Sequence, residues 1–158
     1  MRGTIFITAA LLALAMVPLA GATELTREEY VSRVEPICKR NTEANKRIFA
    51  GAPEQVKAGK LKAASTHFTR AVGAFEKTIG QLRAVPQPPS DEAKLEKWIG
   101  YLEVESSYLG RIGGALAQGD KGKAQTLSVR LNRNSNLANN AVLAFGFSYC
   151  KIDPSRFG

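Results

Sequence analysis

Apolar residues recur every three or four positions in four stretches of this chain, and no stretch alternates with a period of two. A spacing near 3.6 residues places apolar side chains on one face of an α-helix. The four stretches cover residues 27–50, 61–84, 91–118 and 121–145. Amphipathic helices of this length joined by short connections predict an all-α fold, an antiparallel up-down-up-down four-helix bundle. The alternative is a three-helix core with the first stretch loosely packed.

The third and fourth stretches define their buried faces clearly, because their apolar residues return with helical spacing over several turns. These faces are predicted to form much of the core. They consist of Leu95, Trp98, Leu102, Leu109, Ile112 and Leu116 in the third stretch, and Ala124, Leu127, Leu131, Ala138, Val142 and Phe145 in the fourth.

Capping residues mark the ends of the predicted helices. Thr26 and Glu29 have the spacing of a capping box, in which each side chain accepts a hydrogen bond from the other residue's backbone. Ser90 follows a proline-rich linker and is predicted to cap the third helix. Gly119 suits the end of that helix, and Asp120 is predicted to cap the fourth.

The first 22 residues have the layout of a secretory signal peptide. A basic start is followed by the apolar run 5–17, by Pro18 and by the small residues Ala20-Gly21-Ala22. We expect cleavage after Ala22, which leaves residues 23–158 as one bundle domain without a membrane span. The alternative is an uncleaved anchor, but Pro18 shortens the apolar run below the roughly 20 residues that a span requires.

Cys38 and Cys150 are the two cysteines of the chain. In an exported protein, an even cysteine count favours pairing. The alternative is a reactive thiol, which would need a neighbouring base, and the sequence offers only His67. We therefore predict a structural disulfide between Cys38 and Cys150.

Polar residues interrupt the apolar face of the first helix. At 100° per residue, Asn41 and Asn45 lie within about 20° of the centre of that face. Bundle register places them level with Ser106, with other polar residues at the flanks. This layer is either a small ligand pocket or, as we prefer here, a device that fixes helix register. The layer would contain Asn41, Asn45, His67, Glu105 and Ser106.

The fourth helix contains an unusual run of asparagines between residues 132 and 140. Asn132, Asn136 and Asn139 recur with helical spacing and form a possible surface stripe. Amide groups in such a row can hydrogen-bond a sugar or a peptide. An ordinary solvated helix face is the plainer interpretation.

The sequence contains no recognisable catalytic constellation. It shows no nucleophile–base pair, phosphate-binding loop or metal-ligand spacing, and its single histidine cannot make a metal site alone. We therefore expect no enzymatic activity, no cofactor and no metal.

Basic residues outnumber acidic ones by 22 to 14, which gives a net charge of +8. Many of them belong to the end of the predicted bundle that holds the first and third connections. This positive pole suits an anionic envelope polymer or an acidic protein, whereas nothing indicates nucleic-acid binding. A simply solvated surface remains the alternative. The residues are Lys39, Arg40, Lys46, Arg47, Lys57, Lys60, Lys62, Lys121 and Lys123.

The C-terminal part of the chain, Phe145-Gly146-Phe147 followed by Cys150, resembles that of small exported helical proteins of high-GC Gram-positive bacteria. Pro88-Pro89, Gly119-Asp120 and Cys38 fit the same resemblance. It implies export, a helical bundle and a Cys38–Cys150 bridge, and it brings no catalytic residues. Leu25-Thr26 is also similar to the Leu-Thr motif of small periplasmic helical chaperones, but position 29 is Glu instead of Gln.

Together these features predict an exported, non-enzymatic helical bundle that acts as a binding or structural module of the cell envelope. Two alternatives stay open, a chaperone-like holder of unfolded clients and a small-ligand-binding bundle that uses the polar core layer.

Overall fold

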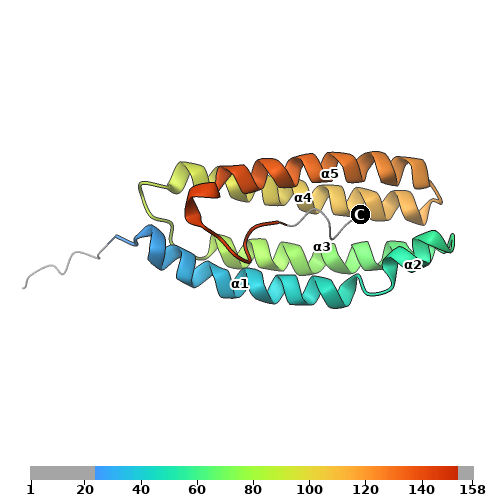
Figure 1. The fold of residues 1–158 in the computed structure, drawn as a ribbon, viewed down its shortest axis with the longest axis horizontal. Coiled ribbons are helices and arrows are strands. Elements are labelled where there is room, and N and C mark those ends of the chain that lie inside the picture. Colours follow the sequence, from blue (N-terminus) through green and yellow to red (C-terminus); the bar gives the residue numbers. More distant parts are fainter. Residues whose placement is uncertain (1–23, 153–158) are drawn as a thin grey trace, which may run out of the picture.

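The computed structural model describes residues 24–152, so the predicted signal peptide lies outside the described part of the chain. All regular elements in this part are helical (Figure 1). In chain order they are α1 (Arg27–Ile48), α2 (Ala52–Lys57), α3 (Leu61–Arg83), α4 (Glu92–Ala117), α5 (Lys121–Ala141) and the 3-10 turn η1 (Leu143–Phe145).

The four long helices α1, α3, α4 and α5 run alternately up and down, which confirms the predicted antiparallel four-helix bundle (Figure 1). The apolar faces predicted for α4 and α5 are buried throughout. Helix α1 is also part of the core, because its Tyr30 and Val34 side chains are fully buried. The three-helix core with a loose first segment is therefore not the observed fold.

Two of the three predicted caps are present. Thr26 and Glu29 form a capping box at the start of α1, and Asp120 accepts a hydrogen bond from the Lys123 amide at 2.8 Å. The prediction for Ser90 is wrong, because Asp91 is the N-cap residue of α4. Asp91 does not cap with its side chain either.

The Asp91 carboxylate instead links the start of α4 to the start of α1. Its two oxygens accept hydrogen bonds from Arg27 Nε at 2.8 Å and Nη2 at 2.7 Å. The side chain is only 1 % exposed, and the adjacent Arg27 guanidinium holds the pKa of Asp91 below its usual range. The bidentate pair gives this carboxylate two charge-assisted hydrogen bonds to a full positive charge, and the carboxylate therefore serves the tertiary contact.

Two segments differ locally from the prediction. After the expected break at residue 50, the structure has a short helix, α2, that was not predicted. Pro53 lies in its first turn, where proline is compatible with a helix. At the other end, α5 stops at Ala141 instead of continuing to residue 145, and the η1 turn follows. Gly146 then takes a left-handed conformation with φ of 63° and redirects the chain.

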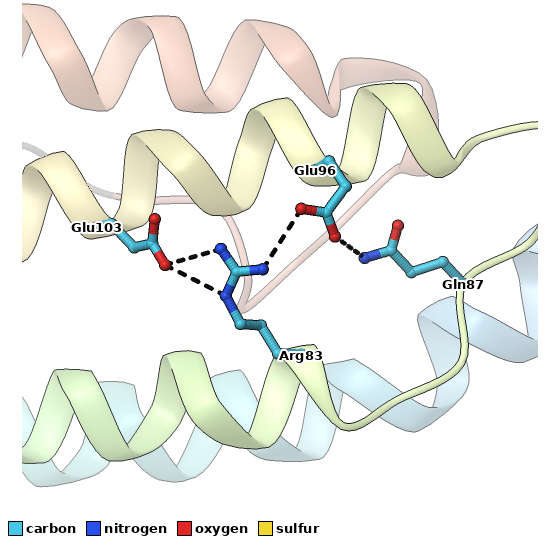
Figure 2. Close-up of polar contacts among 4 residues, drawn as sticks. All are labelled: Arg83, Gln87, Glu96 and Glu103. Carbon is cyan, nitrogen blue, oxygen red and sulfur yellow. Dashed lines mark hydrogen bonds and ion pairs between the residues drawn. The ribbon is translucent and has the colours of Figure 1, made fainter.

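Helices α3 and α4 pack closely along their length. At the surface, Arg83 of α3 donates to Glu103 at 2.7 Å and to Glu96 at 3.4 Å, and Gln87 donates to Glu96 at 2.8 Å (Figure 2). This network is exposed and therefore adds little stability. In the interior, a Cβ atom added at Gly113 would lie 2.9 Å from the Cβ atom of Phe68.

We predict opposite effects for alanine at two neighbouring glycines of α4. Gly114→Ala meets no atom within 4 Å and should raise the free energy of unfolding by up to about 1 kcal/mol through helix propensity. Gly113→Ala crowds Phe68 and should lower it by about 1–3 kcal/mol. Urea unfolding of both variants tests this, and equal stabilities would contradict the close α3–α4 approach.

Candidate functional site

A cavity of about 280 Å³ lies inside the bundle, between α1, α3, α4 and the C-terminal strap, the name used here for residues 146–152. It is the natural candidate for a functional site because pockets for small molecules are concave and mainly apolar. The lining residues that carry the argument are Asn41, Asn45 and Lys46 of α1, Phe75, Thr78 and Leu82 of α3, Trp98, Leu102, Glu105 and Leu109 of α4, and Tyr149, Lys151 and Ile152 of the strap.

The C-terminal strap is attached to both α1 and α5. A disulfide joins Cys38 of α1 to Cys150, with a Cα–Cα distance of 4.9 Å, which confirms the predicted bridge. On α5, the Asn139 side chain makes two hydrogen bonds with the Ile152 backbone, at 2.7 and 2.8 Å. Glu35 of α1 accepts hydrogen bonds from backbone amides of the strap, that of Ser148 at 2.8 Å among them.

Aromatic packing anchors the beginning of the strap in the core. The Phe147 ring lies 5.4 Å from that of Trp98 and 5.4 Å from that of Phe145, and Phe145 contacts Tyr30 edge-on. Phe145 and Phe147 are both buried. Since Gly146 turns the chain between them, both rings reach the core although the helix has ended.

The inner wall of the cavity is mostly apolar. Trp98, Leu102 and Leu109 of α4 are fully or almost fully buried, and Phe75 and Leu82 of α3 complete this wall. The indole Nε1 of Trp98 has no hydrogen-bond partner within residues 24–152. Because buried polar groups are normally hydrogen-bonded, this unpartnered N–H is an exception among the described residues.

The α1 side of the cavity is polar. Thr78 Oγ1 of α3 lies 3.3 Å from Asn41 Oδ1. One turn further along α1, the half-buried Asn45 has no partner for its Oδ1 atom in the described part of the chain. The cavity therefore combines a large apolar wall with a few polar groups, which is the composition of a small-molecule site.

Glu105 is the buried carboxyl group of the site. It is 1 % exposed, and both of its oxygens accept hydrogen bonds from α5, from Ser135 Oγ at 2.7 Å and from Asn134 Nδ2 at 3.0 Å. Burial raises the pKa of Glu105, and these two hydrogen bonds only partly oppose the effect. The group thus favours its neutral form more than an exposed glutamate does.

Of the five residues expected in a polar layer, three line this cavity, namely Asn41, Asn45 and Glu105. Ser106 is buried outside the lining, and its hydroxyl has no partner in the described residues. The ring of His67 lies further along, where its Nδ1 atom contacts the backbone oxygen of Ile48 at the end of α1.

The three asparagines of the expected surface stripe have different surroundings. Asn136 is exposed, whereas Asn132 is half-buried with a buried Oδ1 atom that has no partner in the described chain. Asn139 is half-buried and is occupied by the strap backbone. Its amide group therefore holds the strap against α5.

Several site residues escaped the sequence analysis. Asn134 and Ser135 lie three and four positions after Leu131, so helical spacing places them on its buried face, and that signal was available. Thr78 was not singled out, and Trp98 was assigned to an apolar helix face without any polar role. Tyr149 and Lys151 belong to an irregular segment, for which periodicity carries no information.

Further searches of residues 24–152 found no group of three or more His, Cys, Asp and Glu side chains that could bind a metal ion. No helix in the same range combines the length and the apolar character that crossing a membrane requires. Exposed lysines of the predicted positive pole, such as Lys57, Lys60, Lys121 and Lys123, lie at the end of the bundle with α2 and the α4–α5 turn (Figure 1). They do not line the cavity.

Comparisons with protein-family models, with curated proteins and with solved structures found no match for this chain.

We predict that removal of the disulfide strongly destabilises the fold. The Cys38→Ala, Cys150→Ala double variant loses a link across 112 positions, and the chain-entropy model gives a loss of about 4–5 kcal/mol. Urea unfolding with and without a thiol reductant measures it. The reductant should shift the wild type and leave the variant unchanged; a loss below about 1 kcal/mol would contradict the entropic account.

The pKa of Glu105 leads to a prediction on pH dependence. Because the folded protein binds this proton more tightly than the unfolded chain does, the free energy of unfolding should fall as the pH rises above the ordinary value of 4.5. Glu105→Gln cannot titrate. Unfolding of both proteins between about pH 4 and pH 8 should therefore show the wild type losing stability relative to the variant. A constant difference would show that the pKa is not raised.

Proposed function

We propose that this protein is an exported, non-enzymatic binding module that holds a small, largely apolar molecule in the cavity under the C-terminal strap. The cavity carries the proposal, since it has a volume of about 280 Å³, close to the lower end of the range for small-ligand pockets. The layout of residues 1–22 and the disulfide support export, because structural disulfides persist in oxidising compartments.

The character of the lining supports a binding role. An apolar wall supplies affinity through the removal of apolar surface from water, and a few polar groups orient the ligand. Trp98 belongs to the apolar wall, because it lines the cavity and its ring is fully buried. A binding module of this kind is favoured over a purely structural one, for which a filled core would be more stable.

We predict that a single-chain aliphatic compound binds in this cavity. The probes are decanol, decanoate and decylammonium, all below micelle-forming concentrations. Trp98 is the one tryptophan of the chain and lines the cavity, so binding should change its fluorescence. Calorimetry supplies the affinity. Binding of none of the three probes would overturn the proposed function.

Two matched variants show whether binding occurs in the cavity. Asn45→Phe places a ring into the lining and should weaken binding at least about tenfold, or 1.4 kcal/mol. Asn136→Phe introduces the same change at an exposed position of α5 and should leave affinity unchanged. Equal effects of the two variants would place the probe elsewhere.

A further inference from the structure

The charged residues of the cavity lining are unevenly distributed. Lys46 of α1 and Lys151 of the strap line it and are exposed, so they lie at its mouth. Neither ammonium group has an ion-pair partner within residues 24–152. A third cation, Lys39, sits 5.4 Å from the centre of the Tyr149 ring, which also lines the cavity.

Two acidic groups near the cavity, Glu35 and Glu105, are already engaged by the protein. Glu35 accepts the amide of Ser148 at 2.8 Å and that of Tyr149 at 3.0 Å. Glu105 receives hydrogen bonds on both oxygens from α5, and its burial disfavours the ionised form. Among the described residues, the charged side chains that line the mouth are therefore both positive, and the overall charge of the sequence, +8, has the same sign.

We propose that the ligand is an amphipathic anion, a free single-chain acid whose acidic group lies between Lys46 and Lys151 and whose apolar part packs on the α4 wall. This inference rests on the proposed function and specifies its ligand class. Trp98, Leu102 and Leu109 offer the aliphatic chain an apolar wall to pack on. Charge complementarity at the mouth then selects an anion over a neutral or cationic compound of the same length.

The test compares decanoate, decanol and decylammonium at neutral pH and low salt. Decanoate should bind at least about twofold more tightly than decanol, since an exposed ion pair contributes only weakly and the mouth offers two. Decylammonium should bind most weakly. Equal binding of decanoate and decanol, or preference for decylammonium, would overturn the anion assignment while the proposed function stands.

Matched double variants locate the charge effect. Lys46→Gln with Lys151→Gln should weaken decanoate about three- to tenfold and leave decanol unchanged. Lys57→Gln with Lys123→Gln removes the same net charge from exposed positions outside the lining and should change decanoate affinity far less. At about 0.5 M salt the effect of the first pair should shrink. Equal losses of decanoate affinity from both pairs would indicate general attraction by the basic surface. They would overturn the proposed position of the acidic group between Lys46 and Lys151.

Discussion

The position of α1 depends on the strap that follows α5. Helix α4 forms extensive interfaces with α3 and with α5, whereas α1 packs mainly against α3 and has a smaller contact with the η1 turn near the end of α5. Residues 146–152 span the space between α1 and α5, bonded to Cys38 and Glu35 on one side and to Asn139 on the other. A segment without regular structure carries backbone amides that need acceptors, and the Glu35 carboxylate accepts those of Ser148 and Tyr149. The disulfide adds a covalent link at the same place.

The cavity follows from this mode of closure. Two directly packed helices interdigitate their side chains at an axial separation of 8–10 Å and leave little space. The strap inserts Phe147 at one end, against Trp98, and then continues with Cys150 and Ile152 along the cavity. A single irregular segment does not fill the volume that a helix face would fill. The unfilled volume costs packing energy. The burial of Glu105 next to it also costs free energy.

Sequence reasoning succeeded where the relevant interaction is local. Helical periodicity placed Leu95, Trp98 and Leu102 in the core, and short-range rules identified the caps at Thr26 and Asp120. It failed at Ser90, because the neighbouring Asp91 is recruited by Arg27, which is distant in sequence. The polar layer shows the same limit. A rotation of 100° per residue correctly turns Asn41 inward, but the partner across the bundle depends on the axial shift of α3 and the course of the strap, which no local pattern records.

The strap contributes to the cavity, to the charge of its mouth and to the attachment of α1. It covers the cavity, supplies Lys151 and Tyr149 to its mouth, and is tied to α1 by the disulfide. Cavity volume, mouth charge and the attachment of α1 are therefore coupled through the same few residues. Loss of Asn139, which contacts only the far end of the strap at Ile152, would leave the disulfide and the Phe147 anchor in place. It would loosen Lys151, which lies between Cys150 and Ile152. Asn139→Ala should therefore reduce the free energy of ligand binding by more than it reduces the free energy of unfolding. The fold depends on the Phe147 anchor, whereas the mouth of the cavity depends on the end of the strap.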